Sequence, residues 1–311
     1  MRKVFARHVE NLEAMCTVRT MSARDLMGQL VELRRWSPDI MHYLAGPSTR
    51  GLLAVTLAGR VLRSTAVILS LIHPELGPVG RRLLSRGRFD AVLGGASTLR
   101  LFDSFRSASY VFTESGVDTR IFSPVDVDQK LVIRRRLGLP ADARIVLHVG
   151  HIKAGRNLAP LRGLTTVGFH VAVVGSSRPG WEVGEMQALK DAGCRVTIDY
   201  QPEIQQWYQA ADCYVFPTID PGNAIQLPLS ILEALAVGLP VVSSDFGSVT
   251  DFLGHNPCVK VIEEIDSETL GAAVSDVLRD TPTASGFAVE FDWGRRTAEL
   301  LEVYRRVSSR A

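Results

Sequence analysis

Short apolar runs alternate along the first part of the chain with segments of helical periodicity. The spacing of Leu26, Leu30 and Leu33 predicts a helix over 23–36, and a second helix is expected over about 49–60. The strand-like runs are DIMHYLAG (39–46), TAVILSLI (65–72), DAVLGGA (90–96) and ASYVFT (108–113). Apolar runs of this length between helices are typical of βαβ units with a parallel sheet.

The second part of the chain repeats this alternation more clearly. Its expected strands are ARIVLHVG (143–150), GFHVAVVGSS (168–177), CRVTIDY (194–200), CYVFPT (213–218) and LPVVSSD (239–245). Helices are expected over 182–192, 204–211 and 228–237, and a last one over 293–307. The pattern predicts an α/β fold with a doubly wound parallel sheet.

A chain of 311 residues exceeds one ordinary domain of roughly 150 residues. Gly138 and Pro140 end a helix just before the first strand of the second part, so the domain boundary is expected near 115–125. We therefore divide the chain into residues 1–118, residues 119–288 and a closing segment 289–311.

The composition is that of a globular protein, with 46% hydrophobic and 22% charged residues. The most apolar stretch, 51–77, is interrupted by Arg60 and Arg63, so no membrane span is expected. The start, MRKVFARHVE, lacks the apolar core of a signal peptide. The four cysteines show no CxxC spacing. Together these features predict a cytoplasmic protein without a structural zinc site.

Charge is distributed unevenly between the two parts. Residues 1–110 hold 16 Lys and Arg against 8 Asp and Glu, whereas the rest hold 19 against 25. The basic part predicts contact with an anionic membrane surface or a phosphorylated ligand; a basic face that serves only solubility is the alternative. The basic residues are scattered and no nucleic-acid recognition motif accompanies them, so nucleic acid is not expected as a partner.

The loop VGHIKAGRNL, at the carboxyl end of an expected strand, is the first candidate for chemistry. Gly150 ends the strand, and His151, Lys153 and Arg156 follow closely. Cations around a glycine bend favour a diphosphate, and Arg offers a bidentate fork. The alternative is a solvated loop whose cations face water.

The segment DPGNAIQLPLSILEALAVGLPVV (220–242) is the second candidate. Pro228 suits a first helical turn, and the backbone N–H groups near Gln226 and Leu227 then form an anion site at the carboxyl edge of the sheet. Glu233 follows amid apolar neighbours, which favours a buried or cleft-facing carboxylate over a surface charge.

The stretch PLSILEALAVGLPVVSSDFGSV resembles the donor-site segment of retaining GT-B glycosyltransferases of the group 1 (family-4) type. Four further segments resemble that family in the right order: SGVDTRIFSP, IVLHVGHIKAGRNL, WYQAADCYVFPT and FDWGRRTAELLEVYRR. The resemblance implies a GT-B fold, in which two Rossmann-like domains face a cleft and the closing helix crosses back to the N-terminal domain.

The resemblance also implies an activity. Such enzymes move a sugar from a nucleotide-diphosphate sugar to a hydroxyl acceptor with retention of configuration, without a metal or other cofactor. The acceptor would be a glycan, a glycolipid or a small molecule, in surface polysaccharide, glycolipid or glycoside biosynthesis. The alternatives are a degenerate nucleotide-binding protein of the same fold without transferase activity and a nucleotide-sugar epimerase.

In the resemblance, Arg156 matches the family's phosphate-binding Lys, and His151 stands where the family usually has Arg. Glu233 matches the second of two motif Glu residues and would bind the ribose hydroxyls. At the first of these positions the chain has Ile225, a departure that leaves the donor-sugar contact open. The residues that could take up that contact are Asp220, Asn223 and Gln226.

The remaining expectations concern the base and the N-terminal domain. Tyr200 and Gln201 are assigned to the base region. His73, in SLIHPE, would lie near the reacting sugar as a catalytic residue, with a capping or core histidine as the alternative. Residues 1–38 show neither the family's first strand nor its Gly-rich loop, so we expect a shortened N-terminal domain.

Overall fold

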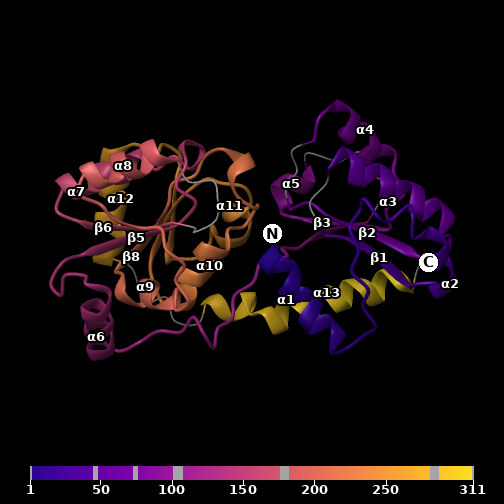
Figure 1. Cartoon of the computed structure of the whole chain (residues 1–311), viewed down its shortest axis with the longest axis horizontal. Coiled ribbons are helices and arrows are strands. Elements are labelled where there is room, and N and C mark those ends of the chain that lie inside the picture. Colours follow the sequence, from indigo (N-terminus) through magenta and orange to yellow (C-terminus); the bar gives the residue numbers. More distant parts are fainter. Residues whose placement is uncertain are drawn as a thin grey trace. The chain divides into compact units, whose positions relative to one another are not determined.

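The computed structural model describes residues 2–44, 48–72, 76–100, 108–175, 182–280 and 287–309. The chain forms two compact units: unit 1 is Met1–Gly116 with Trp293–Ala311, and unit 2 is Val117–Asp292 (Figure 1). Each unit is built on a parallel sheet with helices on its faces, which confirms the expected α/β class. In the described part of the chain, no helix is long and apolar enough to cross a membrane.

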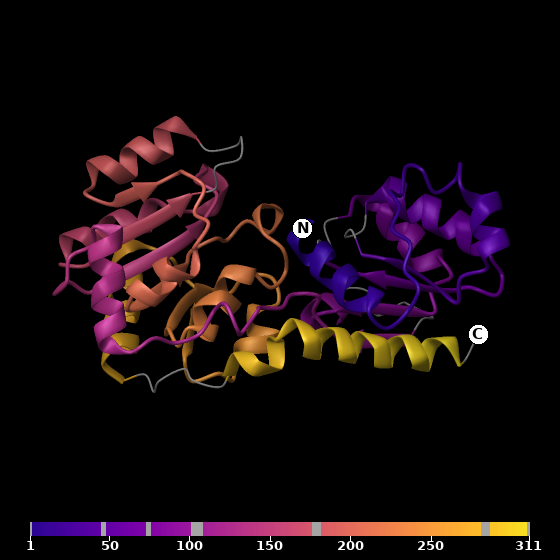
Figure 2. The same cartoon turned by 60° about the horizontal axis from the view of Figure 1, so that its bottom comes forward.

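Unit 1 is built on a four-stranded sheet in the order β1-β2-β3-β4. Its elements are α1 (Arg2–Glu13), α2 (Leu30–Trp36), β1 (Ile40–Tyr43), α3 (Thr49–Val61), β2 (Ala66–Ser70), α4 (Pro78–Arg86), β3 (Ala91–Gly94), α5 (Ala96–Arg100), β4 (Ala108–Val111) and α13 (Trp293–Ser308). Helices α1 and α13 lie side by side (Figures 1 and 2). They cover one face of the sheet through Leu12, Leu300 and Val303, whereas α2 to α5 contribute to the core on the other face.

Unit 2 is built on a six-stranded sheet in the order β10-β9-β8-β5-β6-β7. Its elements are α6 (Val127–Leu137), β5 (Ile145–Gly150), the 3-10 turn η1 (Ala154–Arg156), α7 (Ala159–Thr166), β6 (His170–Gly175), α8 (Val183–Asp191), β7 (Arg195–Thr197), α9 (Gln205–Ala210), β8 (Cys213–Phe216), η2 (Pro221–Asn223), α10 (Leu229–Ala236), β9 (Val241–Ser244), α11 (Val249–Leu253), β10 (Val259–Ile262), α12 (Ser267–Asp280) and η3 (Phe287–Phe291). Helices α6, α9, α10 and α11 pack on one face, and α7, α8 and α12 pack on the other.

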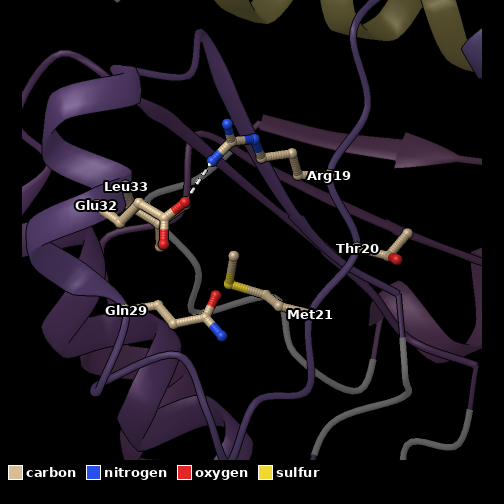
Figure 3. A pocket seen from close by; sticks show the side chains of 6 residues that line it. All are labelled: Arg19, Thr20, Met21, Gln29, Glu32 and Leu33. Atoms are coloured by element: carbon tan, nitrogen blue, oxygen red, sulfur yellow. Dashed lines mark hydrogen bonds and ion pairs between the residues drawn. The ribbon is translucent and has the colours of Figure 1, made fainter.

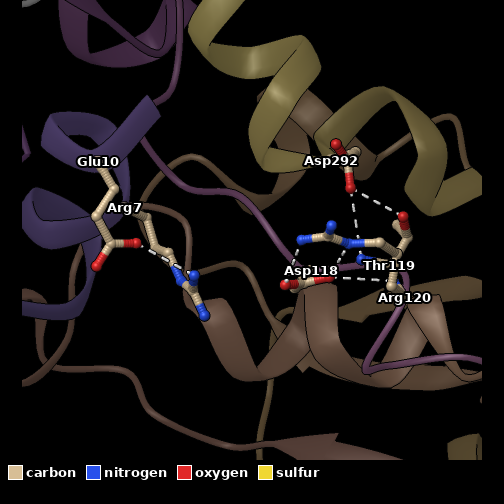
Figure 4. A network of polar contacts seen from close by, with 6 residues as sticks. All are labelled: Arg7, Glu10, Asp118, Thr119, Arg120 and Asp292. Atoms are coloured by element: carbon tan, nitrogen blue, oxygen red, sulfur yellow. Dashed lines mark hydrogen bonds and ion pairs between the residues drawn. The ribbon is translucent and has the colours of Figure 1, made fainter. Parts of the chain in front are cut away.

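The two chain segments that enter and leave unit 2 run next to each other. The N–H of Val117 donates to the carbonyl of Phe291 at 2.8 Å. The hydroxyl of Thr119 donates to Oδ2 of Asp292 at 2.8 Å, and Arg120 pairs with Asp118 at 3.2 Å (Figure 4). These contacts fix both ends of unit 2 against one another.

Four elements differ from the sequence-based expectation. The helix expected over 23–36 begins only at Leu30, after a run of turns. Helix α1 was not expected, although Val4, His8 and Leu12 are all buried at helical spacing, because a histidine interrupts the apolar stripe. Strand β10 and helix α12 were also not expected; they complete the far edge of the sheet in unit 2.

Candidate functional site

The two loops predicted to carry chemistry leave neighbouring strands of unit 2. Strands β5 and β8 pair in parallel in the middle of the sheet, and the chain winds outward from them in opposite directions. Ligands of open α/β sheets bind beyond the carboxyl ends of strands at such a switch point. The fold therefore brings the loop after β5 and the loop after β8 to the position where a ligand is expected.

Direct contacts hold these two loops together. Nδ2 of Asn157 donates to the carbonyl of Pro217 at 3.1 Å, and the hydroxyl of Thr218 donates to the carbonyl of Arg156 at 3.4 Å. Gly155 lies so close to Asn223 that a Cβ at position 155 would overlap the amide of that side chain. A residue with a Cβ at position 155 would therefore require the side chain of Asn223 to move.

Arg156 is buried at the centre of this arrangement. The residue is only 9% exposed, and its Nε has no hydrogen-bond partner. No carboxylate of the described residues pairs with it. Burial lowers the pKa of Arg156 from its ordinary value because the charged form loses its hydration. A guanidinium nonetheless stays charged, so a buried one without an acidic partner is a site that favours an anion.

His148, which the sequence analysis did not single out, lies beside Arg156. A Cβ added at Gly150 would lie 3.0 Å from Nε2 of His148 and 3.5 Å from Nη1 of Arg156. Nδ1 of His148 donates to the carbonyl of Val215 at 3.0 Å, and burial lowers the pKa of the ring to about 4. The neutral imidazole adds no second positive charge beside Arg156. A histidine within an otherwise apolar strand was the available signal.

Glu233 lies in α10 and is also buried, with 8% of its surface exposed. The hydroxyl of Tyr208 in α9 donates to Oε2 of Glu233 at 2.8 Å. Helix α10 has Pro228 at its N-cap, which brings no side chain that could cap the helix. The first turn of α10 is therefore open to a ligand anion at its N-terminus.

Gln226 and Leu227, which lead into α10, are both buried. The carbonyl of Gln226 accepts from the N–H of Ser248 at 2.8 Å, and Gly247 adopts a positive φ of 58° directly against that carbonyl. The loop after β9 thus fixes the segment before the helix, and a side chain at position 247 would displace it.

The other predicted donor-side residues are more exposed. His151, Lys153 and Ile225 are half-buried in the same two loops, where they lie with Arg156. Asp220 is exposed, and its carboxylate accepts from the side chain of Asn223.

The predicted base residues lie elsewhere in unit 2. Tyr200, 77% exposed, and Gln201 follow the edge strand β7, which is separated from β5 by β6. Gln201 accepts from the indole N–H of Trp207 at 2.9 Å. His73 lies outside the described residues.

A pocket of about 310 Å³ lies in unit 1 (Figure 3). Its wall includes Arg19, which pairs with Glu32 at 2.9 Å and lies over the ring of Trp36 at 4.8 Å. Since the cation of this pocket is already paired, its chemistry differs from that around Arg156.

Unit 1 contains a separate buried polar cluster. Nδ1 of His42 is 2.7 Å from the hydroxyl of Tyr304 in α13, and its Nε2 is 2.7 Å from the hydroxyl of Ser70. Ser70 also hydrogen-bonds the carboxyl group of Glu114, whose pKa burial raises to about 7. Burial lowers the pKa of His42 to about 3. These groups bond to one another and tie α13 to the sheet.

Comparison with known proteins shows what this chain is similar to. Residues 156–280 match the family model described as glycosyl transferases group 1. Over these residues the chain is similar to the group 1 glycosyltransferases. The matched region includes Arg156, the loop after β8 and the whole of α10.

Relatives and solved structures agree with this family. A D-inositol 3-phosphate glycosyltransferase of Thermobispora bispora is 27% identical over 226 residues, covering 63% of this chain and 50% of that protein. A putative teichuronic acid biosynthesis glycosyltransferase, TuaC, of Bacillus subtilis is 25% identical over 325 residues, covering 95% and 75%. The crystal structure of Anabaena HepE in complex with UDP superposes with a TM-score of 0.73 at 16% identity, covering 90% and 82%. The fold is GT-B, and the chain spans about half the length of the inositol phosphate glycosyltransferases that it matches.

Proposed function

We propose that this chain is a group 1 glycosyltransferase that moves a sugar from a nucleotide-diphosphate sugar to a hydroxyl acceptor, with retention of configuration. The observation that carries the proposal is the buried Arg156, a cation without an acidic partner in the described residues, at the switch point between β5 and β8. A diphosphate supplies the anion that this position favours, and HepE, of the same fold, has been crystallised with UDP.

The leaving group decides the rate of such a reaction. The bond between C1 of the sugar and the β-phosphate oxygen breaks, the acceptor oxygen bonds C1 on the same face, and the hydroxyl proton passes to the departing diphosphate. Negative charge thus grows on the diphosphate, where Arg156 and the N-terminus of α10 stabilise it. Because these groups are fixed by the fold, they need no reorganisation as the charge develops.

The nucleoside would be gripped by Glu233, whose carboxylate suits the two ribose hydroxyls through charge-assisted hydrogen bonds. The donor sugar lacks a carboxylate partner at position 225, where isoleucine stands. We propose that Asn223, Asp220 and Gln226 take over the contacts with its hydroxyls, and that Tyr200 and Gln201 lie at the base.

Charge neutralisation by a fixed guanidinium and a helix N-terminus makes a metal-independent reaction the natural expectation. TuaC, which matches nearly the whole chain, is named for teichuronic acid biosynthesis. By analogy we propose an acceptor in surface polysaccharide or glycolipid assembly, used on the cytoplasmic side. The exposed Arg82, Arg86 and Arg88 in and after α4 are the groups that would contact an anionic lipid surface.

The test is a screen of UDP-, GDP- and ADP-sugars with glycolipid and glycan acceptors, in the presence and absence of EDTA. Transfer that survives EDTA and gives a product of the same anomeric configuration as the donor is expected. An inverted product would contradict retention, and loss of transfer with EDTA would contradict metal independence. No nucleotide binding at all would overturn the proposal.

A second candidate is nucleotide binding without transfer. Ile225 favours it, because a branched alkyl group cannot hydrogen-bond a sugar hydroxyl. It predicts that free UDP, GDP or ADP binds as tightly as any corresponding nucleotide sugar, and that Ile225→Glu changes only the affinity for the sugar-bearing form. Transfer by the unmodified chain would exclude this candidate.

A further inference from the structure

Tyr208 is buried, makes a hydrogen bond to a proposed ligand residue and is not itself placed to touch a ligand. Its side chain is completely buried, and its hydroxyl donates to Oε2 of Glu233 at 2.8 Å. The ring packs edge-on against Phe122 with centroids 5.7 Å apart and tilted against Tyr214 at the same distance. The phenol therefore has one fixed position in the core.

The direction of this hydrogen bond is determined by the two groups. Burial and the neighbouring Glu233 carboxylate raise the pKa of Tyr208 well above its ordinary value, so the phenol keeps its proton. The hydroxyl donates and the carboxylate accepts. A carboxylate has about four acceptor positions, and the bond to Tyr208 occupies one of them.

Fixing a glutamate side chain in one orientation is entropically unfavourable. The side chain loses rotamer entropy when it is immobilised. A partner that holds it before the ligand arrives removes this cost from binding. Helix α10 fixes the backbone of Glu233, and Tyr208, from α9, contributes a hydrogen bond that restrains the carboxylate.

We propose that Tyr208 is a positioning residue, which holds the carboxylate of Glu233 in the orientation that receives the ribose hydroxyls of a nucleoside diphosphate. The proposal rests on the proposed function, since it requires that the site bind a ribonucleotide. It predicts an effect of Tyr208 that depends on the ligand's ribose hydroxyls and not on its phosphates.

The experiment compares Tyr208→Phe with the unmodified chain. Calorimetric titrations use UDP, GDP and ADP, and then the 2′,3′-dideoxy analogue of whichever binds most tightly. Tyr208→Phe should weaken binding of the ribonucleotide about tenfold, within the range for a hydrogen bond to a charged group, and leave binding of the dideoxy analogue unchanged. The difference between the two ligands isolates the pair interaction, as in a double-mutant cycle.

Tyr214→Phe is the matched control. Tyr214 is an equally buried tyrosine next to Tyr208, but its hydroxyl donates to the carbonyl of Val149 at 3.3 Å and lies near Ser230. Any change that Tyr214→Phe causes should be equal for the ribonucleotide and its dideoxy analogue. Far-UV circular dichroism and thermal unfolding confirm that both variants are folded.

Each outcome decides the proposal. A loss confined to the ribonucleotide supports it. An equal loss for both ligands, or no loss, overturns the role of Tyr208 while leaving the proposed function in place. Failure of the unmodified chain to bind any of the three diphosphates overturns the proposed function and this role together.

Discussion

Among the described residues of unit 2, two arginines are buried, and their surroundings are opposite. Arg134, 5% exposed, pairs with Asp212 at 2.7 Å and donates to the carbonyls of Ala210, Ala141 and Ala143. Arg156, 9% exposed, has neither a carboxylate partner among the described residues nor a hydrogen bond from its Nε. Both guanidinium groups lost their hydrating water on folding, but only for Arg134 do protein hydrogen bonds and an ion pair replace it.

The comparison separates a structural charge, Arg134, from Arg156, for which we propose a function. Arg134 joins α6 to the start of β5 and β8, at the end of the sheet opposite the loops after these strands. Its guanidinium is hydrogen-bonded through Nε and both Nη atoms. Arg156 lies in the loop at the carboxyl end of β5, where the anion that would complete its contacts comes from outside. Proteins retain such an unfavourable burial where binding needs it.

The largest expected effect is on stability, at Arg134. Arg134→Ala should lower the free energy of unfolding by about 3 kcal/mol, because it removes the ion pair with Asp212 and leaves the buried carbonyl of Ala210 without its donor. Lys130, also 2.7 Å from Asp212, limits the loss. Urea unfolding followed by circular dichroism measures it. The nucleotide affinity of the folded Arg134→Ala variant should stay the same. A loss of nucleotide affinity in this variant would show that Arg134 and Arg156 do not have separate roles.

Arg156→Ala should have the converse effect. We expect binding of a nucleoside diphosphate to weaken by about 2–3 kcal/mol, the range for a charged hydrogen bond, and binding of the nucleoside alone to change little. The free energy of unfolding should not fall, because an incompletely satisfied buried charge is removed. Calorimetry and urea unfolding on one preparation measure both quantities. A stability loss as large as that of Arg134→Ala would contradict the functional interpretation.

Glu233→Ala sharpens the comparison at the other end of the proposed ligand. It should weaken nucleoside and nucleoside diphosphate alike by about 1.5–3 kcal/mol, since the ribose is common to both. Calorimetry with the two ligands distinguishes this pattern from that of Arg156→Ala. Unchanged affinity for a folded variant would remove Glu233 from the site.

Glu114→Gln extends the comparison to unit 1, where the buried carboxyl group of Glu114 is hydrogen-bonded to Ser70. The folded-state pKa of Glu114, about 7, lies above its ordinary 4.5, so its contribution to stability is complete at acidic pH and is lost as pH rises toward 7. Between pH 5 and pH 8 the free energy of unfolding of Glu114→Gln should therefore rise by about 2 kcal/mol relative to that of the unmodified chain. The buried His42 and His8 act in the opposite direction in both proteins and cancel in the difference. A difference independent of pH would contradict this assignment.

Sequence patterns predicted the strands of both sheets except β10, and they predicted the position of the loops after β5 and β8. The β-like runs ending at Gly150 and before Asp220 are continuous and apolar, and the parallel order follows from their alternation with helices. The patterns did not predict the contacts of His148 or of the Tyr208 hydroxyl, because the partners of both groups are distant along the chain. Nor did they reveal that Arg156 is buried, since three cations in one loop resemble a solvated surface.

The central claim is that the loops after β5 and β8 form a diphosphate site around Arg156. A crystal structure of the chain grown with UDP, or with whichever of UDP, GDP and ADP binds most tightly, tests it most directly. The account predicts phosphate oxygens within hydrogen-bond distance of the Arg156 guanidinium and of the first N–H groups of α10, with the ribose at Glu233. A diphosphate bound elsewhere, for example at Arg19 in the pocket of unit 1, with Arg156 unchanged, would contradict it.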